Sequence, residues 1–125
     1  AQAGLYTPSE ISRGISELRQ QRHFQVQGKN WQIDSTLQTM VKFKRADLLN
    51  LPTDLGTFDL VLCRNVLIYF DLETRIRVCR QLYKLIEPGG WLALGSAESL
   101  YGIDDRFELV KHGRAVLYHK PRKKM

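Results

Sequence analysis

The sequence predicts an α/β fold with parallel strands, a terminal antiparallel hairpin and a small antiparallel β-subdomain. Two apolar runs, at residues 58–63 and 91–94, are typical of strands buried on both faces of a helix-covered sheet. Apolar residues recur at helical spacing between these runs, so strand, helix and strand predict a right-handed parallel unit. Between residues 23 and 34 the apolar period is two, which predicts antiparallel strands.

A chain of 125 residues is long enough for one modest domain or part of one. We expect residues 1–21 to form a helix of the larger domain and residues 22–46 the β-subdomain. Residues 47–125 then form the parallel strands and the terminal hairpin. The opening Ala-Gln-Ala-Gly resembles neither an initiator segment nor a cleaved signal, so the chain is expected to open within a longer protein.

The formal net charge of +6 is concentrated at the end of the chain, because four of the nineteen basic residues lie between Lys120 and Lys124. The remainder is only mildly basic, and its aromatic residues do not alternate with basic ones as a stacking groove requires. We therefore favour a solvated tail and expect no nucleic-acid partner.

The two cysteines, Cys63 and Cys79, lie in apolar stretches where a free cysteine behaves as a small hydrophobe. No disulfide framework or metal-ligand spacing is present, and His23, His112 and His119 are best interpreted as surface residues. No apolar run has the length of a membrane span. We expect a cytoplasmic protein with no metal site and no membrane insertion.

The first predicted element is a helix that starts at Thr7, with proline next and Glu10 placed to close a capping box. Ile11, Ile15 and Leu18 recur on one side, so one amphipathic helix is expected. Residues 23–27 and 31–34 then predict a hairpin around a glycine-containing turn, and residues 41–45 a third strand.

Polar residues follow both buried strands. Arg64, Asn65 and Tyr69 follow the first strand, and residues 95–99 follow the second. The carboxyl ends of parallel strands meet at one edge, where open α/β sheets bind ligands. The predicted connecting helix is capped by Asp71.

The connecting helix ends before the Glu-Pro-Gly-Gly segment at residues 87–90. Residues 107–111 and 115–120 predict the terminal hairpin.

The usual catalytic constellations are absent from the sequence: there is no glycine-rich phosphate cradle, no nucleophile elbow and no metal-spaced histidine pair. A site of Arg64, Asn65 and Tyr69 suits chemistry in which the protein mainly positions two reactants. The alternative for Arg64 and Asn65 is a capped strand end with a surface ion pair. For Tyr69 it is a core aromatic with a satisfied hydroxyl.

Several motifs together resemble the carboxyl-terminal half of the chemotaxis receptor glutamate methyltransferases, the CheR family. The most specific is the run Cys-Arg-Asn-Val-Leu-Ile-Tyr-Phe at residues 63–70. The opening residues 3–6 and the Arg-His-Phe at 22–24 also resemble that family. The other matching segments are residues 58–71, Pro88-Gly89-Gly90, Leu94-Gly95, Glu98-Ser99-Leu100, Phe107 and Tyr118.

The resemblance implies a partial Rossmann-like fold of the S-adenosylmethionine (SAM) dependent methyltransferases, with residues 47–125 as its carboxyl-terminal half. It implies SAM as cofactor, S-adenosyl-L-homocysteine as product and the cytoplasmic domain of a chemoreceptor as protein substrate. A glutamate carboxylate is ionised at neutral pH, so this reaction requires no general base.

The resemblance also assigns roles to particular residues. Arg64 and Tyr69 are the implied catalytic residues, while Asp47, Leu48, Arg64 and Asn65 are the implied cofactor-binding residues. The family usually has asparagine at the position of Asp47, so a donor to the adenine is replaced by an acceptor.

The family's glycine-rich loop, its ribose-binding acidic residue and its amino-terminal helical domain would precede Ala1. We therefore expect the isolated chain to be inactive and to self-associate through exposed strand edges. Two alternatives stay open: a methyltransferase of another substrate, such as RNA or a small molecule, and a non-catalytic scaffold of the same fold.

Overall fold

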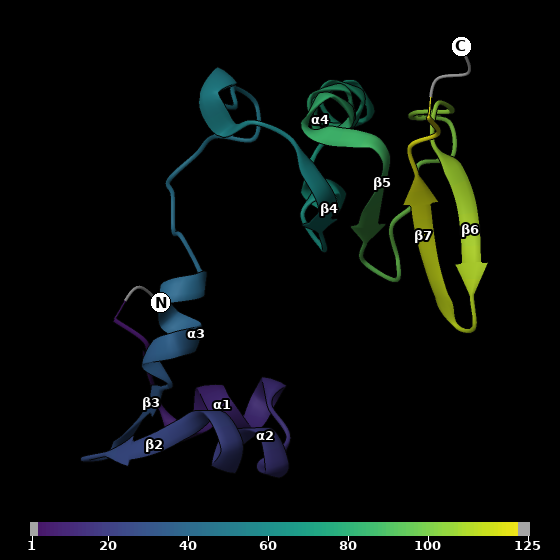
Figure 1. Ribbon diagram of the computed structural model, residues 1–125. Helices are drawn as coiled ribbons and strands as arrows, with labels where there is room; N and C mark the ends of the chain where they lie inside the picture. Colours follow the sequence, from purple (N-terminus) through teal and green to yellow (C-terminus); the bar gives the residue numbers. More distant parts are fainter. Residues whose placement is uncertain (1–2, 123–125) are drawn as a thin grey trace. The chain divides into compact units, whose positions relative to one another are not determined.

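The computed structural model describes residues 3–122. The chain divides between Arg45 and Ala46 into two compact units, each with its own sheet (Figure 1). The first unit contains a three-stranded sheet in the order β1-β3-β2, and the second a four-stranded sheet in the order β4-β5-β7-β6. The predicted α/β class, with a mixed sheet and a separate antiparallel sheet, is confirmed.

The first unit begins with two short helices, α1 (Pro8–Gly14) and α2 (Glu17–His23). The predicted cap is confirmed: Thr7 Oγ1 accepts the Glu10 N–H at 3.2 Å, and Glu10 Oε1 accepts the Thr7 N–H at 2.9 Å. The prediction of one continuous helix is wrong. Ile15 is extended, with φ −129° and ψ 130°, and Ser16 caps the second helix. The predicted apolar stripe therefore does not persist, and Leu18 is exposed.

The small sheet is built on the predicted hairpin of β2 (Phe24–Gln27) and β3 (Asn30–Ile33). Gly28 takes φ +64° in the turn, a conformation that glycine adopts without strain. The prediction of a third strand at residues 41–45 is wrong. The position beside β3 is taken by β1 (Leu5–Tyr6) instead, and residues 41–45 follow the helix α3 (Ser35–Met40) without forming a strand.

The helices α1 and α2 contact β3 and β2 respectively, so they belong to the same compact unit as the small sheet. The division into residues 1–21, 22–46 and 47–125 as functional segments of the whole protein stays a prediction.

In the second unit, β4 (Phe58–Cys63) and β5 (Ile86–Leu94) are parallel, and the helix α4 (Leu72–Leu85) connects them. Asp71 caps α4 as predicted, with its Oδ1 accepting the Thr74 N–H at 2.9 Å. The hairpin of β6 (Glu108–His112) and β7 (Ala115–His119) extends the sheet through antiparallel pairing of β7 with β5. The predicted parallel unit and terminal hairpin are thus both confirmed.

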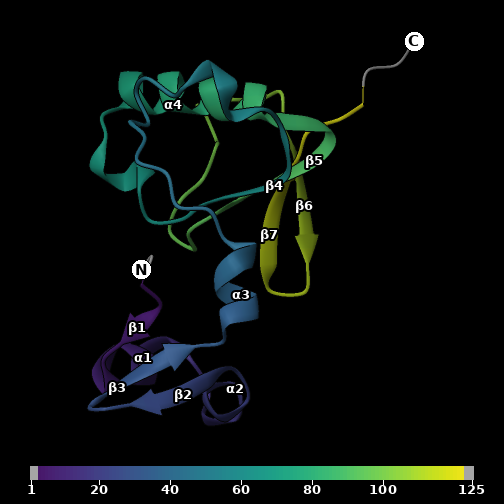
Figure 2. The same ribbon diagram turned by 60° about the vertical axis from the view of Figure 1, so that its left-hand side comes forward.

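The core of the second unit lies between this sheet and α4, which runs along one side of it (Figure 2). Val78, Cys79 and Leu82 point from α4 into the core. Burial raises the pKa of the Cys79 thiol to about 12, so it stays protonated and acts as a small hydrophobe, as predicted. The buried cluster comprises Cys63, Leu67, Val78, Cys79, Leu82, Ile86, Leu92, Leu94, Leu100, Phe107 and Tyr118.

The prediction that β4 is buried on both faces is wrong. Val61 and Cys63 pack toward α4, but Leu60 is 54% exposed and Leu62 is 67% exposed. Side chains alternate between the faces of a strand, and no described element of the second unit covers the opposite face. The strand register places one apolar set there, which we call the open face: Leu60, Leu62, Trp91, Ala93, Val110 and Leu117.

The end of the chain differs from the predicted solvated tail at Lys120. Its Nζ donates hydrogen bonds of 2.8 Å to the carbonyls of Tyr83 and Ile86, at the carboxyl end of α4. Carbonyls at this end have no intrahelical donors, and a lysine is a favourable partner for them. Lys123 and Lys124, also part of the predicted tail, lie outside the described residues.

None of the helices in the described part of the chain is long and apolar enough to cross a membrane. Among the same residues, no cluster of histidine, cysteine and carboxylate side chains is arranged to hold a metal ion.

Candidate active site at the carboxyl edge

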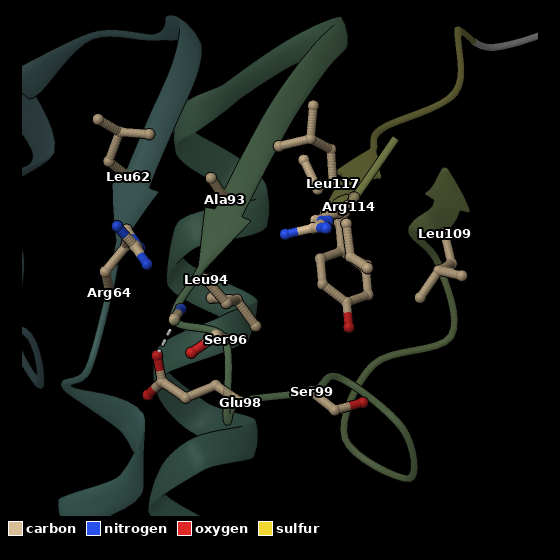
Figure 3. A pocket seen from close by; sticks show the side chains of 14 residues that line it. Leu62, Arg64, Ala93, Leu94, Ser96, Glu98, Ser99, Leu109, Arg114 and Leu117 are labelled. Carbon is tan, nitrogen blue, oxygen red and sulfur yellow. Dashed lines mark hydrogen bonds between the residues drawn. The ribbon is translucent and has the colours of Figure 1, made fainter. Parts of the chain in front are cut away.

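Two loops meet at the carboxyl edge of the parallel strand pair. The register of β4 and β5 ends with Cys63 beside Leu94, so residues 64–70 and residues 95–100 both leave the sheet at this edge. Figure 3 shows Arg64 at the end of β4, with Ser96 and Glu98 following β5. The sequence predicted this meeting of polar strand ends.

The first loop has a fixed backbone. Asn65 takes φ 60°, the left-handed region that asparagine tolerates better than most residues. Leu67, only 2% exposed, anchors the loop in the core and begins the short 3-10 helix η2 (Leu67–Tyr69). This anchoring leaves Arg64, Asn65 and Tyr69 at the surface.

Glu98 connects the two loops. Its Oε1 accepts the N–H groups of Gly95 at 2.8 Å and Asn65 at 2.6 Å, and its Oε2 accepts the Ile68 N–H at 3.2 Å. Burial would raise the pKa of the Glu98 carboxyl. The surrounding backbone N–H groups outweigh burial and hold the pKa below its ordinary value. Glu98 is therefore a carboxylate at neutral pH.

Arg75 holds the same loop from its carbonyl side. Its Nε donates to the carbonyls of Leu67 at 2.9 Å and Phe70 at 2.8 Å. Arg75 lies in the first turns of α4, so the helix that covers the core also fixes the loop above it. The backbone around η2 is thus bonded at its N–H groups by a carboxylate and at its carbonyls by a guanidinium.

A cleft of about 700 Å³ opens beside these loops and extends onto the open face, where Leu62, Ala93 and Leu117 line it. Arg64 and Arg114 border it, and among the described residues no carboxylate forms an ion pair with either guanidinium. Figure 3 shows them on opposite sides of Ala93. The lining residues are Leu62, Arg64, Ala93, Leu94, Gly95, Ser96, Glu98, Ser99, Leu109, Arg114, Ala115, Val116, Leu117 and Tyr118.

The predicted site residues separate into two groups. Arg64 lines the cleft, Asn65 is the next residue along the loop, and Tyr69 closes η2 with its side chain 80% exposed. Tyr69 is therefore not the buried core aromatic of the alternative interpretation, and Arg64 is not held in a surface ion pair with any described residue.

Asp47 and Leu48 form the second group and are held near α4. Asp47 Oδ1 accepts the Leu49 N–H at 3.0 Å, and Leu48 packs against the core. The carbonyl of Leu49 accepts a hydrogen bond from Gln81 on α4 at 2.9 Å. No hydrogen bond among the described residues joins Asp47 or Leu48 to Arg64, Asn65 or Tyr69, so their predicted cofactor role stays a prediction.

Sequence reasoning missed two residues and underestimated a third. In the sequence, Arg114 lies in the turn of the predicted terminal hairpin and Arg75 in the predicted connecting helix. Glu98 follows the second predicted strand, but nothing near it in the sequence indicates a bond to the other loop. A signal for Arg75 is its position four residues after the cap Asp71, beneath a loop whose carbonyls need donors. No local signal marks Arg114 as a residue of the cleft.

The chemistry available at this edge is positioning rather than proton transfer. The lining residues within the described part of the chain include no histidine or cysteine, and both oxygens of Glu98 accept backbone hydrogen bonds. Two cations without carboxylate partners favour an anionic ligand. The edge can therefore orient an anion beside a second reactant.

Comparison with known proteins gives one family. The family model described as "CheR methyltransferase, SAM binding domain" matches residues 1–116. "Chemotaxis protein methyltransferase Cher2" of Pseudomonas putida is 35% identical over 92% of this chain and 42% of its own length. "Chemotaxis protein methyltransferase 1" of Pseudomonas aeruginosa is 35% identical over 94% of this chain and 43% of its own length. "Chemotaxis protein methyltransferase" of Vibrio anguillarum is 36% identical over 93% of this chain and 42% of its own length. The chain thus spans about two fifths of these relatives.

Proposed function

Because the chain belongs to the CheR methyltransferase family, we propose that the whole protein transfers methyl groups from SAM to glutamate side chains of chemotaxis receptors. One observation in the structure carries this proposal: the carboxyl edge presents two cations and an amide beside a cleft whose lining has no described histidine or cysteine. That set of residues suits a nucleophile that needs orientation but no activation.

A glutamate carboxylate is such a nucleophile. It is ionised at neutral pH, so one of its oxygens attacks the methyl carbon directly and no proton is transferred. SAM supplies a methyl group activated by the adjacent sulfonium, and S-adenosyl-L-homocysteine leaves as the C–S bond breaks. Arg64 would attract and orient the carboxylate, and Tyr69, which is exposed on the same loop, would approach the transferred methyl.

The residues present fit one wall of a cofactor site. The side chains of Arg64 and Asn65 are exposed, and neither side chain forms a hydrogen bond within the described residues. Both are therefore available to a bound adenosyl group and an incoming carboxylate. Asp47 and Leu48 would contact the adenine from their position beside α4.

The rest of the protein would supply the other wall, including the glycine-rich loop and the ribose-binding carboxylate. The 125-residue chain alone is then inactive, and its open face and free β4 edge lead it to self-associate. The proposed substrate is the cytoplasmic domain of a chemoreceptor, which places the reaction in the cytoplasm.

The test is transfer of labelled methyl from SAM by the whole protein to a chemoreceptor cytoplasmic fragment. We expect base-labile label on glutamates, and none on a fragment whose methylation-site glutamates are replaced by glutamine. Arg64→Ala should lower kcat/KM about 100-fold. Arg13→Ala, which removes an exposed cation from α1, should leave it unchanged.

Three outcomes would contradict the proposal. Label in RNA or in a small molecule instead of the receptor would indicate a methyltransferase of another substrate. Binding of SAM without transfer to any acceptor would indicate a scaffold of this fold. Equal activity of Arg64→Ala and the unmodified protein would show that Arg64 has no role in the reaction.

A further inference from the structure

The half-buried carboxylate of Glu98 at the carboxyl edge is hydrogen-bonded to both loops. Glu98 receives the N–H of Gly95, three residues before it, and the N–H groups of Asn65 and Ile68, which are 33 and 30 residues away. A residue that only caps its own loop would need the first of these bonds. The other two join the loop after β4 to the loop after β5.

The bonds to Asn65 and Ile68 hold the backbone directly beside the candidate reactive side chains, because Asn65 follows Arg64 and Ile68 precedes Tyr69. Asn65 sits at φ 60°, which non-glycine residues adopt only when their surroundings hold them there. The 2.6 Å hydrogen bond from its N–H to an ionised carboxylate is of the strong, charge-assisted kind. Glu98 is thus the group that stabilises this conformation.

The packing around Gly95 also indicates that the two loops are held together at Glu98. A Cβ at this position would overlap Oδ1 of Asn65 and would lie 2.8 Å from Oε1 of Glu98. The Asn65 side chain therefore packs directly against Gly95, next to the hydrogen bond from the Gly95 N–H to the Glu98 carboxylate (Figure 3). The two loops meet at this carboxylate.

Arg75 alone cannot replace Glu98. Its guanidinium bonds the carbonyls of Leu67 and Phe70, at the far end of the loop, and reaches the Ile68 carbonyl only at 3.5 Å. Among the described residues it makes no bond to Arg64 or Asn65. With Glu98 removed, the end of the loop nearest the cleft is the end that is released.

We propose that Glu98 is a positioning residue of the methyl-transfer site, which sets the orientation of Arg64 and Asn65 through their backbone. This inference rests on the proposed function. It goes further by assigning a role in the reaction to a carboxylate through the hydrogen bonds it accepts from the backbone of both loops.

The test uses the whole protein and three variants: Glu98→Ala, Glu98→Gln and the control Glu108→Ala. The amide introduced by Glu98→Gln would keep one oxygen that can accept the Gly95 and Asn65 N–H groups, but it offers an NH₂ group instead of an acceptor to Ile68. Glu108 is an exposed carboxylate on β6, in the same sheet but away from this edge.

The first readout needs no cofactor and no activity. Amide hydrogen exchange across residues 64–70 should be at least about tenfold faster in Glu98→Ala than in the unmodified protein. Glu98→Gln should lie between them, and Glu108→Ala should match the unmodified protein. Exchange in residues 24–33 serves as an internal reference, since these belong to the other compact unit.

The second readout is kinetic. Glu98→Ala should lower kcat by about 10–100-fold, as misplaced groups do, while KM for the receptor fragment changes less than about threefold. Glu98→Gln should restore part of kcat, which a residue needed only for overall folding would not show. If Glu98→Ala does not fold, the comparison of Glu98→Gln with Glu108→Ala carries the test.

Failure of this inference can be distinguished from failure of the proposed function. If the unmodified protein transfers methyl groups and Glu98→Ala keeps its kcat or its slow exchange at residues 64–70, the positioning role is overturned. If the unmodified protein transfers no methyl group to any receptor fragment, the proposed function fails and the role assigned here fails with it. Faster exchange in Glu98→Ala would then show only that Glu98 stabilises the loop at residues 64–70.

Discussion

The two faces of the four-stranded sheet differ sharply although the same strands build both. On the face toward α4, Leu92 is fully buried in a continuous core that also includes Val78 of the helix. On the open face Leu60 and Leu62 are largely exposed, although they belong to the strand that contributes Cys63 to the core.

This difference in burial indicates which surfaces of the sheet are packed within this chain. Parallel strands are normally covered on both faces, so we expect the whole protein to cover the open face outside the cleft and the edge of β4 that no described strand pairs with. The carboxyl edge lies between the two faces. Its loops are held by Glu98 and Arg75, so the edge that we propose as one wall of the site is ordered within this chain.

The largest expected effect is a difference in stability between substitutions on the two faces of the sheet. Leu92→Ala should lower the free energy of unfolding of the 125-residue chain by about 2–5 kcal/mol, because it leaves a cavity in the core. Leu62→Ala makes the same change on the neighbouring strand and should cost less than about 0.5 kcal/mol. Urea unfolding measures both, and equal losses would show that the open face is covered in solution.

The second effect concerns the edge itself. Gly95→Ala should destabilise the chain by about 1–3 kcal/mol, because the added methyl overlaps Asn65 and crowds Glu98. Gly14→Ala is the matched control, since a Cβ there meets no atom within 4 Å. The control should be neutral or slightly stabilising. A tolerated Gly95→Ala would mean that the two loops are not closely packed.

A third effect tests the open face as a contact surface between copies of the isolated chain. Leu62→Lys places a charge on the open face and should weaken self-association at least about tenfold, measured by sedimentation equilibrium. Leu18→Lys is the control, because Leu18 is equally exposed on α2 but outside this face. A chain that stays monomeric at all concentrations would contradict the expectation.

The smallest effect is the pH dependence of the contribution that Glu98 makes to the stability of the chain. Its folded-state pKa lies below the ordinary value of 4.5, so its contribution to stability is fully present above that pH and is lost as pH falls through the folded-state pKa. The stability difference between the unmodified chain and Glu98→Gln should therefore be constant above about pH 5 and shrink below about pH 4. A difference that does not change with pH would mean that Glu98 is not the titrating group.

Local patterns in the sequence were sufficient to predict much of this architecture. The Thr7 capping box, the Asp71 cap, both hairpins and the parallel strand pair depend on short-range preferences and were all predicted. The meeting of two polar strand ends was also predictable, because it follows from parallel topology alone.

Features that depend on distant partners could not be predicted in the same way. A two-residue strand such as β1 carries no periodic signal, and the exposure of Leu60 and Leu62 depends on what covers them. Lys120 was assigned to a solvated tail because nothing in its neighbours indicates a helix end 34 residues away. Glu98 and Arg75 are recognisable as organisers of the site only once the loops they join are placed.

The central claim, that the carboxyl edge of β4 and β5 forms one wall of a SAM site, is most directly tested by hydrogen exchange of the whole protein with and without S-adenosyl-L-homocysteine. Calorimetry first establishes that the ligand binds. We then expect slower exchange at residues 63–70 and 95–99 and no change at residues 24–33. Binding that leaves residues 63–70 unprotected would contradict this account.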